Sequence, residues 1–458
     1  MPLSNEPVLL RITFTPRGEG ATLRWEADLL GVRLSRLVHP FPLADLPLIL
    51  RALDVLQDPA YPVARTAAQT RHFSFDEGER ARLAALNLLD DLGHVVGDAP
   101  RRLGQSLYAA LTTDPDGRTA LESTYDHAVA LGVPLHLELG FPADAARLAA
   151  LPWELLWDDG AAPLLFSRGL PGSLTRRLDL ARALPPTRRV QGPLRILAIS
   201  PTAGIGPELR QIERAARQEA LAPLINAGLA MVEEIEPADR QALARAITAG
   251  SPPDIIHFYG HGRLRGREGE LLLDEPRGGG WLSSGAMASL VGGVGLVALF
   301  ACQGASVGVG SGEPLLGGVA QALVAAGAPA VLGMQLAVRA HAATRAAATI
   351  YAALAAGESL QHGVAQARRA LFIAERDGAS WFVPALYVRE RTGQPYHLRP
   401  VAANAQTGAT LPPGARQSVI ARGGTIRSLR IQGRTGSNQR VFATAGGTIS
   451  DVTIRDIS

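Results

Sequence analysis

The sequence predicts an α/β protein built on a mostly parallel sheet, and three observations carry that prediction. From residue 194 onward, short apolar runs alternate with segments whose apolar residues recur at helical spacing. Such alternation implies parallel strands joined by right-handed crossovers, with helices on both faces of the sheet. Apolar residues make up 47% of the chain and charged residues 19%, which is typical of globular domains. At 458 residues, two or three domains are expected.

The residues before this pattern predict a mixed α+β region. VLLRITFTP and ATLRWEADLL alternate as a strand pair around the turn TPRGEG, and two helical patterns follow. The helices are predicted over LADLPLILRALDVLQ and DEGERARLAALNLLDDLGHVV, a further strand over VPLHLELGFP, and a short strand pair over PLLFSRGLPGSLTRRL. The arginine- and proline-rich stretch 182–193 indicates a boundary.

Beyond that boundary the predicted elements follow one another at short intervals. They are strand 194–200, helix 207–222, strand 229–237, helix 238–250, strand 254–260, strand 295–301, helix 315–327, strand 328–336 and helices 342–356 and 359–374. A polar hairpin region, ELLLDEPRGGGW, separates the third strand from the fourth. In sheets of this kind, functional groups gather beyond the carboxyl ends of the strands.

The composition excludes several chemistries. The chain has no lysine, so all 45 basic residues are arginine, and a phosphate-binding lysine, a Schiff base and a Ser–Lys dyad are excluded. The single cysteine, Cys302, excludes an intramolecular disulfide, a cysteine-based zinc site and a CxxC pair. For the chemistry that the family resemblance given below implies, we expect no metal and no organic cofactor.

The same features predict a cytoplasmic protein without a membrane segment. The start MPLSNEPVLLRITF lacks the pattern of a signal peptide, and one free cysteine suits a reducing compartment. The longest apolar region, 290–338, is interrupted by glycines and by Pro314 and Pro329, so it predicts buried strands and helices rather than a membrane span.

Two reactive side chains follow two of the predicted strands. His261 lies between two glycines after DIIHFY, and Cys302 follows LVALFA. A thiol needs deprotonation to become a nucleophile, and a neighbouring histidine is a common means. Backbone N–H groups of exposed turns could then stabilise an oxyanion, and the glycines Gly262 and Gly304 would let a substrate come close. The alternative is structural: His261 would be a turn residue and Cys302 a small core residue.

The motifs around these residues resemble a known family. FYGHG and LVALFACQGA are similar to the His-Gly and Ala-Cys signatures of caspase-like (clan CD) cysteine peptidases, and above all to the CHAT domain family. LPWELLWDDGAAPLLFSRGLPGSLTRRL, EPLLGGVAQALVAAGAPAVLGMQ and AQARRALFIAERDGASWFVPALYVR resemble further family segments in the same order, from about Leu103 to Arg389. The resemblance implies a caspase-like α/β sandwich. It also implies that His261 is the general base, Cys302 the nucleophile, and Gly262 with Cys302 the oxyanion hole of a cysteine endopeptidase.

The substrate pocket is less well defined by the sequence. Arg339 lies where many family members place an acid, so it could favour an acidic or uncharged substrate residue, or it could be a solvated residue at the start of a helix. Glu313 and Asp254 are the other candidate pocket residues, and a surface position or helix capping explains each equally well. His257 lies on the same strand face as His261 and is predicted to be a packed, hydrogen-bonded core residue. Trp153, Trp157 and Trp381 are predicted to pack in the core.

The tail contains an internal repeat. QSVIARGGTIRSLRI (417–431) is echoed by QRVFATAGGTISDVTI (439–454), with one extra residue before the second Gly-Gly. Each copy is predicted as a strand–turn–strand unit. Stacking on related copies would make it a recruitment or oligomerisation motif for a second copy of the chain or a sensor protein. The alternative is a small β-solenoid cap or hairpin pair folded on the protease. The arginines of the tail are spread along it rather than gathered in a run. Nucleic-acid binding, which would weaken with salt, is therefore a weaker hypothesis than recruitment.

These observations divide the chain into five predicted parts. They are an N-terminal α+β region (1–125), the N-terminal part of the CHAT region (126–190), the catalytic core (191–400), a linker (401–415) and the β-repeat tail (416–458). The resemblance implies a bacterial signalling or defence effector that acts on proteins and is activated by proximity or a partner. The rival hypothesis is a catalytically inactive CHAT scaffold that serves as a protein-interaction module.

Overall fold

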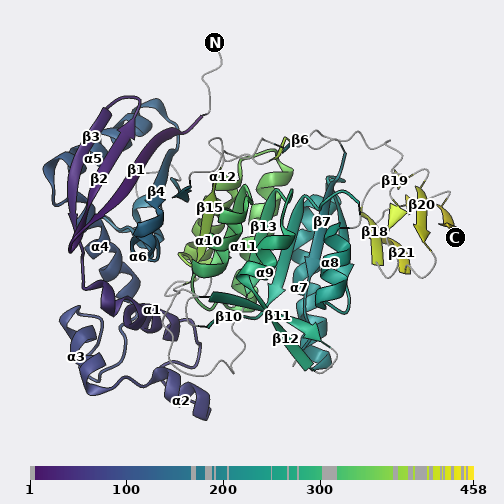
Figure 1. The fold of residues 1–458 in the computed structure, drawn as a ribbon, viewed down its shortest axis with the longest axis horizontal. Helices are drawn as coiled ribbons and strands as arrows, with labels where there is room; N and C mark the ends of the chain where they lie inside the picture. The colour runs from purple at the N-terminus through teal and green to yellow at the C-terminus, as the bar shows by residue number, and fades with distance from the viewer. Residues whose placement is uncertain are drawn as a thin grey trace.

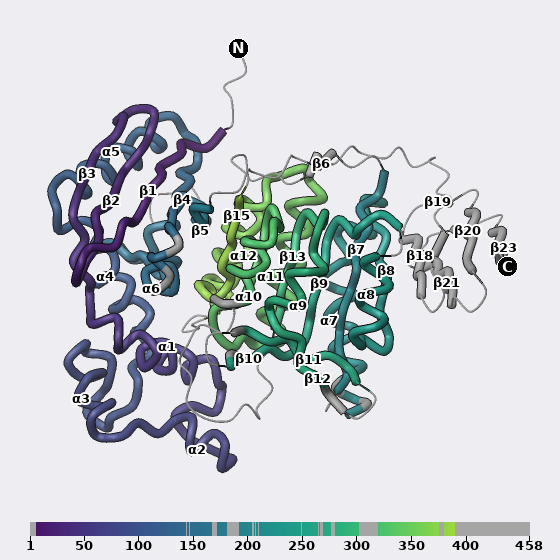
Figure 2. The backbone as a smooth tube through the Cα atoms, in the orientation of Figure 1, coloured from purple at the N-terminus to yellow at the C-terminus, as the bar shows by residue number. Residues whose placement is uncertain are grey.

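The computed structural model describes most of the chain. The described residues are 6–166, 172–180, 188–189, 192–203, 206–248, 250–265, 268–275, 278–301, 317–374, 380–389, 396–397 and the tail strands 410–411, 416–422, 425–426, 429–434, 438–444, 448–449 and 452–457. Cys302 and Glu313 lie outside them. Figure 2 traces the whole backbone from the N-terminal strands to the tail.

Among the described residues, thirteen strands form one sheet in the order β21-β18-β8-β7-β9-β13-β14-β15-β5-β4-β1-β2-β3. The bounds are β1 (Val8–Arg17), β2 (Gly20–Ala27), β3 (Gly31–Val38), β4 (Leu135–Pro142), β5 (Ser173–Asp179), β7 (Leu194–Ile199), β8 (Ala230–Ile235), β9 (Ile255–Gly260), β13 (Leu296–Ala301), β14 (Ala330–Met334), β15 (Pro384–Val388), β18 (Arg416–Arg422) and β21 (Asn438–Thr444). Strands β8, β7, β9, β13 and β14 run parallel, which confirms the predicted α/β fold with a mostly parallel sheet.

Helices cover both faces of this central part (Figure 1). A right-handed crossover from β7 to β8 places α7 (Pro207–Asn226) on one face, and α11 (Ala340–Ala355), which packs on α7 and on α12 (Leu360–Ala374), lies on the same face. The same rule places α8 (Arg240–Thr248), α9 (Ser284–Leu290) and α10 (Gly317–Ala326) on the other face. Strands β9, β13 and β14 are therefore buried on both sides, as their continuous apolar sequences predict.

A small antiparallel sheet lies at the carboxyl edge of the large one. It consists of β10 (Gly262–Arg265), β11 (Glu268–Glu275) and β12 (Gly278–Ser283), in the region predicted as a polar hairpin. Its middle strand is tied to the end of β9 because the N–H of Leu272 donates to the carbonyl of His261 at 2.9 Å.

The N-terminal strands continue the large sheet. The predicted pair is confirmed as the antiparallel strands β1 and β2, and β1 pairs in parallel with β4, which in turn pairs with β5. Strand β3 was not predicted. Neither were helices α2 (Ala67–Phe73), α4 (Ala99–Thr112) and α5 (Pro115–Leu131), whereas α1 (Leu46–Val55) was.

Two predictions for this region were wrong. The helix predicted over residues 76–96 ends early, as α3 (Glu77–Ala85), because Asn87 adopts a left-handed φ of 56° and Asp90 then accepts the backbone N–H groups of Leu92 and His94. Where a strand pair was predicted over 163–178, the described residues 163–166 and 172–178 contain one strand, β5. Residues Leu164–Phe166 form a 3-10 turn instead, and β5 finds its partners in β4 and β15.

The tail repeat forms two stacked rungs rather than two separate strand–turn–strand units. Copy one contributes β18, β19 (Thr425–Ile426) and β20 (Leu429–Arg434), and copy two contributes β21, β22 (Thr448–Ile449) and β23 (Val452–Ile457). Each strand pairs in parallel with its counterpart in the other copy. The first rung also contacts the large sheet, where Arg416 of β18 pairs with Glu234 of β8.

The tryptophans named from the sequence are packed as predicted. Trp153, Trp157 and Trp381 are all buried, and Trp157 and Trp381 meet edge to face. In the part of the chain that the structure describes, no helix has both the length and the apolar character to cross a membrane.

Candidate active-site edge

The candidate base His261 follows directly on the buried strand β9. In the parallel pairing of β9 with β13, Gly260 stands opposite Ala301, and these are the residues just before His261 and Cys302. His261 is half-buried, and Gly262, which opens β10, is buried. The described strands therefore end in register, one residue before each member of the sequence-predicted dyad.

The turn after His261 is firmly held. The side chain of Arg263 donates to Glu270 at 2.5 Å, and its guanidinium lies 3.9 Å from the ring centroid of Trp281. The loop after the neighbouring strand β7 is fixed by Asp274, whose carboxylate accepts the N–H of Thr202 at 2.8 Å and that of Ala238 at 2.9 Å. This preorganised backbone forms one side of the carboxyl edge.

A small polar cleft of about 30 Å³ opens beside this loop, between the ends of β7 and β8 and the helix α7. Its charged lining residues are Arg210, Glu213, Arg214, Arg217, Glu234 and Glu236, and Ser200 and Thr202 also contribute. Arg217 lies 3.0 Å from Glu234, and Arg214 lies 3.4 Å from Glu236. The sequence analysis missed this cleft, although the helical spacing of residues 210, 213, 214 and 217 marks a single charged face of α7.

The candidate pocket residues lie apart from one another. Arg339 precedes α11 near the carboxyl edge, and its Nε donates to the carbonyl of Gln57 at 2.8 Å. Asp254 lies at the opposite edge, before β9, where its carboxylate accepts the N–H of Arg195 at 2.8 Å. The structure thus places Arg339 on the same edge as His261, and Asp254 at the other end of the strand.

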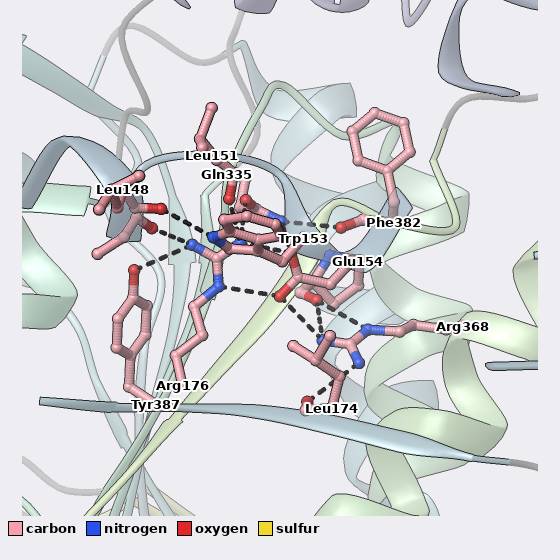
Figure 3. A network of polar contacts seen from close by, with 12 residues as sticks. Leu148, Leu151, Trp153, Glu154, Leu174, Arg176, Gln335, Arg368, Phe382 and Tyr387 are labelled. Atoms are coloured by element: carbon pink, nitrogen blue, oxygen red, sulfur yellow. Dashed lines mark hydrogen bonds and ion pairs between the residues drawn. The ribbon is translucent and has the colours of Figure 1, made fainter. Parts of the chain in front are cut away.

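A fully buried ionic network supports the segment after β14 (Figure 3). Arg176 from β5 donates its Nε to Glu154 at 3.0 Å and Nη2 to Gln335 at 2.7 Å. Gln335 in turn donates its Nε2 to Glu154 and to the carbonyl of Phe382, both at 2.9 Å. Arg368 from α12 reaches Glu154 at 3.4 Å and donates to the carbonyls of Pro384 and Leu174.

The charges of this network stabilise one another. Burial opposes ionisation of Glu154, but Arg176 and Arg368 outweigh it and hold the pKa of that carboxyl below its usual value. Burial lowers the pKa of Arg368 to about 10, which still leaves it charged at neutral pH. The network anchors the segment 335–339, which leaves the sheet at the carboxyl edge.

Two further histidines are buried and neutral. His257 is fully buried on β9, and its Nδ1 lies 2.8 Å from the hydroxyl of Tyr351, as predicted for a packed core residue. His136 on β4 lies between the hydroxyls of Ser173 and Thr175, at 2.7 and 3.1 Å. Burial lowers the pKa of His136 to about 4, and burial with a smaller contribution from Arg217 lowers that of His257 to about 3. Because both ring nitrogens of His136 meet hydroxyls inside the sheet, we assign it a structural role.

The comparison with protein families decides the identity of this fold. The model of the CHAT domain matches residues 101–397, which is most of the chain. The chain belongs to the CHAT domain family. The α/β fold with a mostly parallel sheet and helices on both faces agrees with the fold class that the sequence predicted. In the described part of this CHAT protein, no cluster of His, Cys, Asp and Glu could hold a metal ion.

Solved structures provide more distant likenesses. Two structures of the Saccharomyces cerevisiae separase–securin complex match 84% of the chain at 12% identity, with TM-scores of 0.43 and 0.44. The match covers 30% of the separase chain, so this CHAT protein corresponds to under a third of that chain. The Arg-specific cysteine proteinase gingipain R matches 64% of the chain at 9% identity, with a TM-score of 0.35 and 68% of its own chain covered. No curated protein sequence matches.

Proposed function

We propose that this CHAT protein is a cysteine endopeptidase in which His261 is the general base and Cys302 the nucleophile. The observation that carries the proposal is the register of β9 and β13. Gly260 and Ala301 stand opposite each other at the carboxyl edge, and the two reactive residues come next in the sequence. The buried strands and the held turn at Arg263 supply the rigid support that a catalytic pair needs.

The proposed reaction needs no metal and no organic cofactor. The imidazole of His261 accepts the thiol proton of Cys302, and the thiolate attacks the carbonyl carbon of the scissile peptide bond. The backbone N–H groups of Gly262 and Cys302 donate to the resulting oxyanion. The imidazolium then protonates the departing amine, which leaves a thioester, and water hydrolyses this thioester with His261 again acting as base.

Mapping new protein N-termini in a bacterial lysate tests this proposal. The native chain should generate new N-termini that Cys302→Ala and His261→Gln do not generate. The matched control is His341→Gln, because His341 is an exposed histidine at the start of α11, and it should cleave as the native chain does. Identical N-termini from the native chain and Cys302→Ala would instead favour the interaction scaffold.

As a second function, we propose that the tail recruits a further copy of this chain or a sensor protein carrying the same repeat. The supporting observation is that the two copies already pair with each other position by position, as Gln417 does with Gln439 and Val419 with Val441. In the described part of the chain, β21, β22 and β23 are the last strands of their sheets, so copy two presents an open edge.

Light scattering over a range of concentrations tests the recruitment proposal. The full chain should assemble beyond a monomer, and removal of residues 416–458 should abolish assembly. A chain carrying Val441→Pro, which removes a backbone donor from β21, should lose assembly as well. If the shortened chain assembles like the full one, the tail is a cap on the protease. Comparing cleavage by both chains shows whether assembly activates the peptidase.

A further inference from the structure

The C-terminal end of α1 contacts the segment that follows β14. Asp54, in the last turn of α1, accepts the backbone N–H of Ala337 through Oδ1 at 2.9 Å. In the turn after α1, the backbone carbonyl of Gln57 accepts from Nε of Arg339 at 2.8 Å. Both hydrogen bonds join residues that are more than 280 positions apart in the sequence. The end of α1 thus holds two alternate residues of segment 336–339.

The two acceptors on the N-terminal side are themselves fixed. Gln57 is only 4% exposed, and its side-chain Oε1 accepts from the hydroxyl of Ser380 at 2.9 Å. The side chain of Asp54 is 12% exposed, and its second carboxylate oxygen lies 3.3 Å from Nε2 of His72 on α2. A hydrogen bond from a backbone N–H to a carboxylate is stronger than one between neutral groups. The contact with Ala337 is therefore a firm one.

Segment 336–339 leaves the sheet beside the strand that leads into Cys302. Leu299 of β13 pairs with Gly333 of β14 in the parallel register of these strands. Two residues further along, Ala301 therefore stands level with the residue just before the segment. Cys302 follows Ala301 in the sequence. The segment thus borders the place where the proposed nucleophile would meet its substrate.

We propose that Asp54 and Gln57 are positioning residues, which hold segment 336–339 in the conformation that binds the substrate peptide. Both residues precede the part of the chain that the CHAT model matches, which begins at residue 101. The inference rests on the proposed peptidase function and gives the N-terminal region a part in it. The bond from its Nε to Gln57 makes Arg339 a member of this support rather than a charge that selects the substrate residue.

Positioning of this kind affects substrate binding more than the chemical step. If only a fraction of the molecules has the segment in its binding conformation, the apparent affinity falls in proportion to that fraction. A substrate that has bound selects the correct conformation, and the catalytic pair then acts on it as before. Loss of the contact therefore raises KM and leaves kcat nearly unchanged.

The first experiment measures hydrogen–deuterium exchange of the full chain by mass spectrometry. In Asp54→Ala the N–H of Ala337 loses its acceptor, and this amide should exchange about tenfold faster, as expected for the loss of one hydrogen bond to a charged group. Amides of β9 and β13 should exchange as in the native chain. Asp54→Asn keeps an acceptor oxygen and should stay close to the native rate. The matched control is Asp91→Ala, on an exposed aspartate of the same region.

Two results of this experiment overturn the inference. Unchanged exchange in segment 336–339 would mean that α1 does not hold the segment. Exchange that rises equally in β9 and β13 would mean that α1 only stabilises the fold as a whole. Arg339→Met removes the second contact from a half-buried side chain and should also speed exchange in the segment, so the test stands even if Asp54→Ala does not fold.

The second experiment measures the kinetics of cleavage, with a synthetic peptide that spans a Cys302-dependent cut from the lysate as the probe. In Asp54→Ala, KM should rise about tenfold while kcat stays within about twofold of the native value. Asp54→Asn should restore the native KM. Arg339→Met should raise KM in the same way and leave the residues that precede the mapped cuts unchanged.

The outcomes separate this inference from its rivals. A changed residue preference in Arg339→Met would mean that Arg339 contacts the substrate directly. A fall in kcat equal to the fall in kcat/KM for Asp54→Ala would mean that the N-terminal region supports the catalytic pair instead. Failure of the peptidase proposal is distinguishable, because the native chain and Cys302→Ala then generate the same N-termini, whereas exchange in segment 336–339 still decides whether α1 holds it.

Discussion

Two of the buried polar clusters in the described part of the molecule, one around Glu154 and one around Arg217, differ in how completely their groups are bonded. Around Glu154, the guanidinium groups of Arg176 and Arg368 are surrounded by a carboxylate, an amide and backbone carbonyls. Around Arg217, the guanidinium Nε, the hydroxyl of Ser200 and Nε2 of His257 have no hydrogen-bond partner among the residues that the structure describes. Both clusters are charged and largely hidden from solvent, so burial alone does not separate them.

This difference separates a fully bonded network from a partly bonded one. Closing a buried network completely fixes the elements it joins, and here it joins the turn at Glu154, β5, α12 and the segment after β14. Leaving buried donors unbonded costs stability, so the cluster around Arg217 contributes less to the fold than a fully bonded one. The contrast predicts that a substitution in the cluster around Glu154 lowers the free energy of unfolding strongly. A similar substitution in the cluster around Arg217 should lower it only slightly.

The largest loss of stability is expected from Glu154→Gln. Removal of the carboxylate charge leaves Arg176 and Arg368 buried without a counter-ion, and breaking a buried ion pair in this way costs about 3–5 kcal/mol of unfolding free energy. Urea denaturation measures the loss, with the exposed Glu219→Gln on α7 as control. A loss below about 1 kcal/mol would mean that the network does not hold the fold.

The second-largest loss of stability is expected from Gln335→Leu, a substitution that approximately keeps the size of the side chain. It leaves Arg176 and Glu154 each short of one hydrogen bond and frees the carbonyl of Phe382, at a cost of about 1–3 kcal/mol. The same denaturation experiment applies, with Gln241→Leu on the exposed face of α8 as control. Equal stability of the two variants would contradict the assigned role.

Acidification should destabilise the protein through its buried histidines. The folded-state pKa values of about 4 for His136 and about 3 for His257 lie below the unfolded value of 6.5. The unfolded chain therefore binds more protons below pH 6.5, and the stability present above that pH falls by about 1.4 kcal/mol per pH unit for each histidine. Denaturation midpoints between pH 7 and 4.5 measure this slope. His136→Gln should flatten it, and an unchanged slope would show that His136 protonates freely in the folded state.

The smallest effect is expected from a matched pair of serines. Ser173→Ala removes the partner of His136 Nδ1 and should cost about 1 kcal/mol, whereas Ser200→Ala removes an unbonded hydroxyl and should cost less than about 0.5 kcal/mol. Thermal denaturation of both variants measures the comparison. If Ser200→Ala proves the more costly substitution, the second cluster is as structural as the first.

The sequence predicted the central strands well because their signal is local. Strands such as β7, β9 and β13 are continuous apolar runs, and the helices between them show their period within a single window. The helix predicted past Asn87 shows the limit, since a left-handed residue inside a helical pattern changes no periodicity. The predicted dyad depends on two sequence motifs, one after β9 and one after β13. Because Cys302 lies outside the described residues, its role as nucleophile is inferred from the sequence alone.

The two polar clusters could not be predicted from such signals. Glu154, Arg176, Gln335 and Arg368 meet across more than two hundred residues of chain, so no window contains their pattern. The charged face of α7 is visible in the sequence, but its burial depends on the pairing of β7 with β8. The absence of a partner for Arg217 Nε follows only from tertiary geometry.

The two copies of the tail repeat differ by one residue in the spacing of their strands. Arg416 pairs with Asn438, 22 residues later, whereas Thr425 pairs with Thr448, 23 residues later. The extra residue lies between β21 and β22 in the sequence. The two copies therefore differ in length, but no paired strand contains the additional residue. A shift of one residue exchanges the two faces of a strand. Under the proposed recruitment, an incoming chain with an extra residue inside a strand would turn the opposite face of that strand toward copy two.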